Sequence, residues 1–509
     1  MTTRETEASR SKLVFKKSTL AVCIAALTAA QAYGQNTAEN PIALEEVVVY
    51  GVKSSLETAQ DLKRDSSVVQ DVITASDIGA LPDKSVVEAL QRVPGVTIER
   101  FEASNDPDHF SVEGGNVTVR GLNRVRGEIN GRDGFSATGD GGLNYSDIPP
   151  EMVGAVIVKK SQSANSIEGG ISGTINIATR KPFDSDGFVL GGSVKASYAD
   201  LIDEVKPSAS FIVGDVWDTD AGKFGALVSI AYSDFSSRGD GVGVFNYKPV
   251  TNAGSNPDGE NRFAPIGGSA RQQENNRERL GIAGSLQWAN PSETVQATLE
   301  FIRSDSTLTW TEHFLEFPAE PFSNDAGSAN LNIVDGTYNC LPGSQPCLFG
   351  SGLILGGNGA DGEADRSFRG NPFYVAGVRT RDDERVVDDI SFNLQYSPNE
   401  NLTLSGDLQY ARATNKVSDF TVHGRMSSTD AYLDLRNSEK PGFEILDNGN
   451  GTSLNSAESY FMRSAMDHVA DSEGDETAIK LDAKYSFDQG LITGVEAGVR
   501  FSNRTIDFK

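Results

Sequence analysis

The side chains with the most reactive chemistry in this sequence are few and far apart. Cys340 and Cys347 enclose a turn rich in Pro and Gly, and two cysteines so placed in an exported chain form a disulfide more often than not. A short loop of this kind gains roughly 2–3 kcal/mol from closure. We expect no metal there, because no third Cys or His lies nearby. The histidines are too scattered for a ligand set, at His109, His313, His423 and His468.

Motifs of the common catalytic centres are missing from the sequence. It contains no Gly-x-Ser-x-Gly elbow, no phosphate-binding loop and no paired catalytic histidines. Asp361, Glu363 and Asp365 alternate along a loop but do not complete a calcium-binding pattern, so solvated loop is the favoured interpretation. We therefore expect a protein that is not an enzyme and requires neither cofactor nor metal.

The N-terminal residues 1–34 have the organisation of a secretory signal peptide. An apolar run, Leu20–Ala30, precedes small residues suited to cleavage at Ala32 or Gly34. Cys23 lies inside the apolar run and is expected to leave with it. The basic residues that precede the run are Arg10, Lys12, Lys16 and Lys17.

Composition excludes two broad classes of protein. The chain has 509 residues and a formal net charge of −26, which would repel nucleic acid phosphates. After the signal, no apolar run approaches the roughly 20 residues of a membrane-spanning helix, which excludes a polytopic helical protein. The 52 glycines favour turns and strands over long helices.

Residues 35–52 form a short tail that contains a β-branched run, Leu44–Tyr50. Such a run in a tail is an exposed edge strand, which proteins normally avoid. Two interpretations stay open: it adds to the sheet of another protein, or it pairs within its own domain.

Residues 53–183 predict a compact α+β domain. Ser85 and Glu88 have the spacing of a capping box, and Val86, Leu90 and Val93 share one face of the helix that follows. Pro94-Gly95 ends that helix. The expected strands are 96–100, 117–120, 128–130, 155–159 and 173–179.

From residue 187 to 509 the pattern changes to long strands with a period of two. In 402–410, for example, Leu402, Leu404 and Leu408 share one face, while Thr403 and Ser405 share the other. Nine segments follow the pattern: 188–199, 206–216, 223–237, 278–289, 293–312, 384–396, 401–423, 475–487 and 491–508.

The connections between these segments alternate in length. Four are tight, at 217–222, 290–292, 397–400 and 488–490, whereas those at 238–277, 313–383 and 424–474 are long; 200–205 is short on the long-loop side. Short turns on one side and long loops on the other indicate an outer-membrane β-barrel. A soluble β-sandwich would also alternate, but its strands average five or six residues and its long loops need not share one end.

Several stretches together resemble the TonB-dependent outer-membrane receptors across essentially the whole mature length. Glu45–Gly51 is similar to the TonB box of that family. Motifs similar to those of its plug domain are found at 81–96, Val119-Arg-Gly121, Asn130-Gly-Arg132, 148–159 and 168–182.

The resemblance implies an N-terminal plug folded inside a membrane all-β barrel of about 22 antiparallel strands. Nine strands would not close around a plug, so we expect the sequence to be part of a longer barrel. It also implies a receptor in the bacterial outer membrane, in contact with its lipid, with the plug and TonB box accessible from the periplasm. TonB and its inner-membrane energising proteins would be its partners, contacting Glu45, Glu46, Val47, Val48, Val49 and Tyr50.

On such a plug, polar and aromatic side chains could face a hydroxyl-rich or anionic ligand. The alternative for Arg120 and Arg132 is pairing with acids that line the barrel, for which Asp407, Asp482 and Glu496 are candidates. The expected ligand-facing residues are Arg120, Asn123, Arg124, Arg126, Arg132, Phe135 and Tyr145.

Three functions stay open from the sequence. The plug motifs most resemble receptors linked to oligosaccharide uptake, and a ferric siderophore or other metal chelate is the second candidate ligand. A surface signalling or adhesion receptor is less favoured. Signalling members usually carry a further folded domain before the TonB box, and only about ten residues separate the signal from Glu45.

Overall fold

The computed structural model describes most of the chain after its N-terminal segment. None of the helices in this part is long and apolar enough to cross a membrane. The predicted signal peptide and the TonB-box-like run fall outside it. The described residues are 59–64, 66–74, 85–103, 106–139, 141–244, 247–250, 256, 260–265, 267–317, 333–340, 346–354, 373–427, 430–437, 441–446, 456–489 and 492–509.

The first folded region is built on a five-stranded sheet with the order β1-β6-β7-β4-β5. β4 and β7 are parallel, and the other neighbours are antiparallel. A separate hairpin pairs β2 (Val96–Ala103) with β3 (Asp106–Val119). The sheet strands are β1 (Gln70–Thr74), β4 (Val125–Ile129), β5 (Arg132–Asp133), β6 (Val153–Lys159) and β7 (Gly173–Thr179).

Helix α4 (Val86–Leu90) lies against the β2–β3 hairpin, and its start agrees with the sequence. The Glu88 amide donates to Ser85 Oγ at 3.2 Å, which satisfies one of the free N–H groups of the first turn. Val86, Leu90 and Val93 are all buried, as predicted. The helix ends earlier than expected, because Gln91, Arg92 and Val93 donate to carbonyls three residues back, which tightens the chain into turns before Gly95.

Three short 3-10 helices also occur here, two between β5 and β6 and one between β7 and the first long strand. They are η1 (Tyr145–Asp147), η2 (Pro150–Met152) and η3 (Pro182–Asp184). All five strands predicted here exist, and only β7 has the predicted limits. The others extend further because their ends are continued by pairing that no local pattern announces, as in the irregular β2–β3 hairpin.

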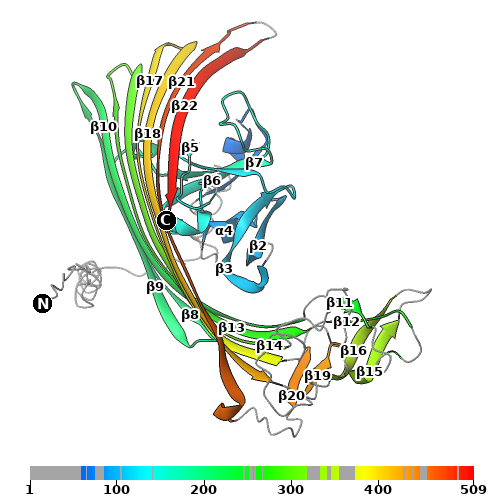
Figure 1. Ribbon diagram of the computed structural model, residues 1–509. Helices are drawn as coiled ribbons and strands as arrows, with labels where there is room; N and C mark the ends of the chain where they lie inside the picture. Colours follow the sequence, from blue (N-terminus) through cyan, green and yellow to red (C-terminus); the bar gives the residue numbers. More distant parts are fainter. Residues whose placement is uncertain are drawn as a thin grey trace, which may run out of the picture. The chain divides into compact units, whose positions relative to one another are not determined.

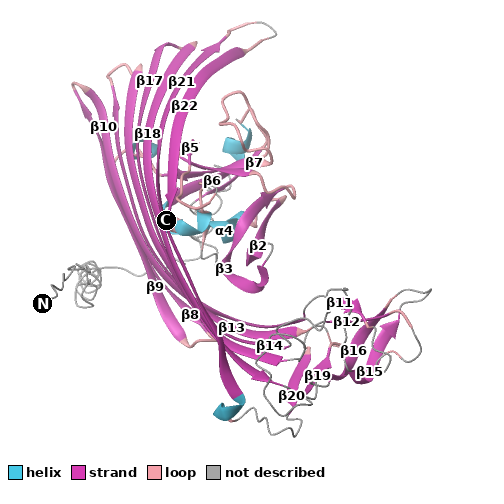
Figure 2. Cartoon of the chain, viewed as in Figure 1, coloured by secondary structure: helices cyan, strands magenta, loops and turns pink. Residues whose placement is uncertain are grey.

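The second region is a nine-stranded antiparallel sheet, which we call the wall (Figures 1 and 2). Its neighbours follow the chain in order from β8 to β22. The strands are β8 (Val189–Ala199), β9 (Glu204–Thr219), β10 (Gly222–Val244), β13 (Gly268–Ala289), β14 (Val295–Phe317), β17 (Phe373–Asn399), β18 (Leu402–Ser427), β21 (Tyr460–Ser486) and β22 (Gly494–Phe508).

The nine predicted segments correspond to these nine strands, but several strands are much longer than predicted. β10 and β13 stay paired from Lys223 and Ala289 to Val244 and Gly268, so both strands extend into the stretch 238–277 that was expected to be loop. β17 and β21 likewise begin well before 384 and 475. In these extensions polar residues occupy both faces, so alternation is lost while the backbone pairing continues.

The two faces of the wall differ in chemistry. On β18, Leu404, Leu408 and Tyr410 are exposed on one face, while Gln409 on the other face is buried. The buried face meets the first region, because Ala231, Ala283 and Ile302 of the wall join the same apolar cluster as Leu90, Val156 and Ile175. The fold is therefore an incomplete barrel wall with an α+β domain packed on its polar face.

Part of the long connections forms a further sheet, which the sequence did not predict. Its strand order is β11-β12-β16-β19-β20, with β15 paired to β16, so connections after β10, β14 and β18 contribute to one sheet. Cys340 and Cys347 lie opposite each other on β15 and β16 and form a disulfide. The strands are β11 (Tyr247–Pro249), β12 (Arg262–Pro265), β15 (Ile333–Cys340), β16 (Cys347–Ile354), β19 (Asp430–Asp434) and β20 (Gly442–Leu446), with η4 (Ala457–Ser459) following.

Candidate functional site

The plug-like region is attached to the wall through buried ion pairs. Arg132 on β5 lies 2.7 Å from Glu300 and 2.8 Å from Asp407, both on the wall. Burial alone would lower the pKa of Arg132, but the two carboxylates outweigh it and raise the pKa above its usual value. Pairing with wall acids, the alternative left open by the sequence, is therefore the arrangement observed for Arg132.

A second group of charges surrounds Asp133. Arg126 and Arg504 donate to its carboxylate, and Arg504 also pairs with Glu476. Burial raises the pKa of Asp133, and the guanidinium groups oppose this rise. Phe135 is buried beneath Arg504, whose guanidinium carbon lies 5.1 Å from the ring centre. Arg126 thus pairs within the plug-like region, whereas Phe135 is covered by a wall residue.

The remaining candidates divide into one structural residue and three that border a cavity. Arg120 donates to the Lys160 carbonyl at 3.1 Å and has a left-handed backbone, with φ of 54°. Asn123 and Arg124 are exposed and line the cavity. Tyr145 lines it too and is otherwise buried, which raises the pKa of its phenol.

This cavity, the long-loop cavity, has a volume of about 640 Å³ and lies between the plug-like region and the half of the wall nearest the long connections. Its volume is within the range of small-molecule sites in proteins. The wall contributes residues from three neighbouring strands: Gln273, Asn275 and Arg277 of β13, Leu308 and Trp310 of β14, and Asp383 and Arg385 of β17.

The sequence missed all of these wall residues. Gln273 to Arg277 and Asp383 fell within stretches expected to be loop. A signal did exist, because Gln273, Asn275 and Arg277 are spaced by two, as on one face of a strand. The absence of apolar residues between them concealed it.

The charges along the cavity wall are matched by neighbouring carboxylates. Arg277 lies 3.2 Å from Asp147, and Arg385 lies 2.6 Å from Asp383. Next to them, Arg279 is fully buried, pairs with Glu113 and donates to the Ser146 carbonyl at 2.6 Å. Each of these three guanidinium groups thus has a carboxylate partner.

Two buried oxygen atoms of cavity-lining side chains accept no hydrogen bond. Gln273 and Asp383 are only 2% exposed. Gln273 Oε1 and Asp383 Oδ1 are buried from solvent and have no hydrogen-bond donor among the described residues. Buried acceptors normally have a donor, because an unsatisfied one costs roughly 1–3 kcal/mol. Both therefore favour a ligand that offers hydroxyl or N–H groups.

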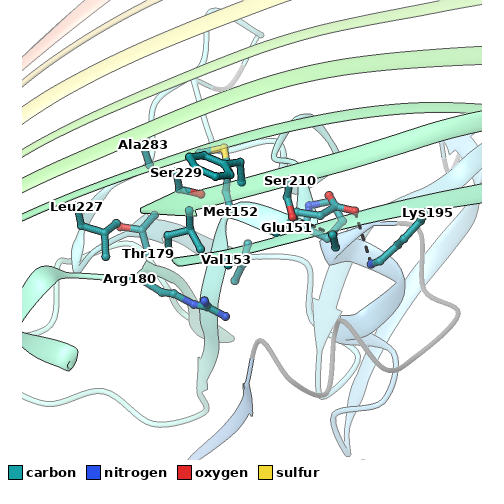
Figure 3. Close-up of a pocket in the computed structure, with 16 residues that line it drawn as sticks. Glu151, Met152, Val153, Thr179, Arg180, Lys195, Ser210, Leu227, Ser229 and Ala283 are labelled. Carbon is teal, nitrogen blue, oxygen red and sulfur yellow. Dashed lines mark hydrogen bonds and ion pairs between the residues drawn. The ribbon is translucent and has the colours of Figure 1, made fainter. Parts of the chain in front are cut away.

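A second, smaller space of about 270 Å³, the short-turn hollow, lies on β8, β9, β10 and β13 nearer the short turns. Figure 3 shows its lining residues. Glu151 and Lys195 point toward each other there, with Oε1 and Nζ 3.7 Å apart. The hollow is also lined by hydroxyl groups of Thr179, Ser193, Ser210 and Ser229.

No group of His, Cys, Asp and Glu suited to hold a metal ion occurs in the described part of the chain. The site's polar groups are instead amides, hydroxyls and paired charges. Such groups bind and orient ligands.

Comparison with known proteins assigns the first region. Residues 62–174 match the family model of the TonB-dependent receptor plug domain. The chain carries a TonB-dependent receptor plug domain. The resemblance expected from the sequence motifs is confirmed over these residues, which lie inside the predicted 53–183.

Solved structures similar to the chain include one transporter and two receptors. The unliganded ferric citrate transporter FecA has 10% identity, covering 88% of this chain and 80% of that chain, with a TM-score of 0.26. The siderophore receptor PiuA from Acinetobacter baumannii has 10% identity, 87% and 62% coverage, and a TM-score of 0.34. A mutant ferric enterobactin receptor PfeA from Pseudomonas aeruginosa has 12% identity, 89% and 72% coverage, and a TM-score of 0.27. No curated protein gives a significant match.

Proposed function

We propose that this protein is a TonB-dependent receptor of the bacterial outer membrane that actively imports a scarce or large nutrient, and that the nutrient is a neutral oligosaccharide. It acts as a transporter and carries out no reaction on its ligand. The observation that carries the proposal is the long-loop cavity between the plug domain and the wall, with its unsatisfied buried acceptors.

The outward face of the wall supports the location. Its exposed side chains are apolar on successive strands, as at Leu190, Ile230, Leu286 and Leu408. Exposed apolar surface of this extent is found on proteins that meet lipid or a partner. Outer-membrane lipid provides that environment.

The charge balance of the cavity favours a neutral ligand. Arg277, Arg279 and Arg385 already face Glu113, Asp147 and Asp383. An anionic ligand would have to compete with these buried pairs, whereas a sugar hydroxyl can donate to Gln273 Oε1 or Asp383 Oδ1 without displacing a cation. Amide side chains such as Asn275 supply both donors and acceptors for the remaining hydroxyls.

A ligand test can use the chain's own tryptophan. Trp310 lines the cavity, and replacing Trp217 and Trp288 by Phe would leave it as the only tryptophan. The purified protein is titrated with maltotriose, cellotriose, xylotriose and triacetylchitotriose, with ferric citrate as an anionic chelate. We expect a saturable fluorescence change with one neutral trisaccharide. No change with any of them would contradict the assigned ligand class.

Energy coupling is assigned to the run Glu45–Tyr50, which would pair as a strand with TonB in the periplasm. Replacing Val48 with Pro removes a backbone donor from that strand. We expect Val48→Pro to abolish uptake while trisaccharide binding stays unchanged, and Val48→Thr, which keeps the N–H group, to retain uptake. Unchanged uptake by the proline variant would rule out this run as the TonB contact.

A ferric siderophore or similar metal chelate is the second candidate ligand. Arg124 favours it, because its exposed side chain borders the cavity and could attract an anion. A fluorescence response to ferric citrate that Arg124→Gln weakens at least tenfold would support this candidate. Binding without any TonB-dependent uptake would instead favour a surface signalling or adhesion receptor.

A further inference from the structure

We propose that the short-turn hollow is a second binding site, which receives the end of the same hydroxylated ligand after it leaves the long-loop cavity. The proposal rests on the proposed function, because it takes the ligand to be a neutral oligosaccharide. It adds a second binding site on the wall and the plug–wall contact that separates the two sites.

Glu151 supplies the main evidence for a ligand in the hollow. Its side chain is only 9% exposed, and its Oε2 atom is buried with no donor among the described residues. Lys195, at 3.7 Å, approaches only the other oxygen and is half exposed. A buried carboxylate oxygen without a donor is costly, so a group that donates to it would bind there.

The remaining lining identifies that group as a hydroxyl. The hydroxyls of Ser193 and Ser210 are 2.8 Å apart and bonded to each other, and those of Thr179 and Ser229 complete a hydroxylated lining. The lining charges are of both signs, because Lys195 and Arg180 accompany Glu151. The hollow has less than half the volume of the long-loop cavity, about 270 Å³ against 640 Å³, so it suits the end of a chain of sugars.

The two spaces meet the same strand of the wall and are separated on it. On one face of β13, Arg277 lines the long-loop cavity and Ala283 lines the hollow. Between them lie Arg279, which is bonded to Glu113 and Ser146 of the plug, and Gly281.

Gly281 is covered by the plug. A Cβ atom added there would overlap Met152 Sδ and would lie 2.8 Å from Pro149 Cγ. Met152 therefore occupies the space that a side chain at position 281 would take. Together, Arg279 and Met152 form a barrier between the two spaces, and the plug segment 146–152 must shift for a ligand to pass.

The barrier can be displaced from the wall side or from the plug side, and only the wall-side change leaves both linings intact. Gly281→Ala forces Met152 away, because its Cβ cannot coexist with Sδ. Gly284→Ala is the matched control, since its added Cβ meets nothing within 4 Å on the same strand. Met152→Ala removes the same obstruction from the plug side, in case Gly281→Ala prevents folding.

The experiment follows the arrival of a trisaccharide at both spaces. The probe is maltotriose, or another of the four trisaccharides if that one alone changes Trp310 fluorescence. Trp310 reports the long-loop cavity. An environment-sensitive label on the S193C variant reports the hollow, because Cys23 leaves with the predicted signal peptide and the disulfide holds the other two cysteines. The full chain is used in detergent.

We expect the Ser193 label to respond at least tenfold more slowly than Trp310. Gly281→Ala or Met152→Ala should accelerate it at least tenfold, and Gly284→Ala should not. Glu151→Gln should weaken the label's apparent affinity about tenfold, the loss expected for one bond to a charged acceptor, and leave that of Trp310 unchanged.

Two results would overturn the proposal, and they differ. A silent label in both barrier variants, with Trp310 still responding, would reject the second site and leave the proposed function standing. If Trp310 responds to none of the trisaccharides, the proposed function and the second site are both rejected.

Discussion

The plug domain and the wall bury opposite kinds of residue. In the plug, Leu90, Val156 and Ile175 are fully enclosed in an apolar core. On the wall, Leu408 is 51% exposed while its neighbour Gln409 is 5% exposed, so the apolar side chain faces outward and the polar one faces the plug. The interface between the two regions is consequently polar, and only a few small or isolated wall residues such as Ala231 and Ala283 extend the plug's core.

Because little apolar surface is buried between them, the plug and the wall must be held in position by other contacts. Buried ion pairs supply one, as between Arg132 and Glu300. Glycines in the wall supply another, because plug side chains fill the space above them. A Cβ at Gly225 would lie 2.5 Å from Pro182 Cβ, and one at Gly474 would lie 2.9 Å from Phe135 Cζ. Charge and shape together fix where the plug lies.

The largest expected effect comes from removing one buried interface charge. Glu300→Ala leaves Arg132 buried beside a single carboxylate and also removes the acceptor of Asn130. We expect a loss of about 3–5 kcal/mol in the free energy of plug unfolding. The measurement is the urea midpoint in detergent, followed by tryptophan fluorescence.

Asp240→Ala is the matched control for that prediction. Asp240 is 49% exposed and pairs with Arg238 on the same strand, so its removal should cost less than about 1 kcal/mol. Equal losses for the two variants would contradict a plug held by buried pairs.

The next largest effect concerns the outward face of the wall. Leu408→Arg places a charge where lipid is expected, at a cost of about 2–4 kcal/mol near the middle of a membrane. The fraction of protein that inserts into lipid vesicles should fall. Gln409→Asn, on the opposite face of the same strand, provides the comparison and should insert normally. Undiminished insertion of the arginine variant would mean that this face does not meet lipid.

A smaller effect on stability is expected from deleting one methyl group, and it should differ between the plug core and the wall surface. Ile175→Val deletes one methyl group from a fully buried position and should destabilise the plug by about 1 kcal/mol. Ile479→Val makes the same change at a wall residue that is 43% exposed, and should be close to neutral in detergent. Urea midpoints measure both, and a reversed order would show that the wall has the tighter core.

The smallest effect depends on pH. Burial raises the pKa of Asp71 on β1, but the ammonium groups of Lys160 and Lys63 outweigh it and lower the pKa below its usual value. The ionised group therefore stabilises the plug above the ordinary aspartate pKa of about 3.9, and this contribution is lost as pH falls through the lowered pKa.

Asp71→Asn should accordingly be less stable than the parent at neutral pH, by under about 1 kcal/mol, with the difference vanishing in strong acid. Urea midpoints measured across the acid range test this. A difference that grows as pH falls would reverse the assigned sign.

Local pattern was sufficient for much of the fold. The capping serine of α4, strand β7 and the existence of nine wall strands were all visible as residue types at fixed spacing. The plug motifs were recognisable because they combine turn-forming Gly and Pro with short apolar runs in a fixed order. The ends of strands β10, β13 and β17 could not be recognised in the sequence, because the alternation of polar and apolar residues disappears where both faces become polar.

The candidate site was predicted only in part. Asn123, Arg124 and Tyr145 do line the long-loop cavity, whereas Arg132 and Phe135 are engaged with the wall. A sequence cannot tell these cases apart, because an arginine that faces a ligand and one that faces Glu300 from a distant strand have the same local surroundings.

The sequence by itself therefore determined that nine wall strands exist, which side carries the long connections, and which part of the chain holds the plug motifs. The tertiary structure decided which wall residues face each plug loop, which acceptors are left without donors, and that three long connections share one sheet. The physical reason is range: propensity and periodicity act over a few residues, whereas buried ion pairs, glycine contacts and cavities depend on residues hundreds of positions apart being brought together.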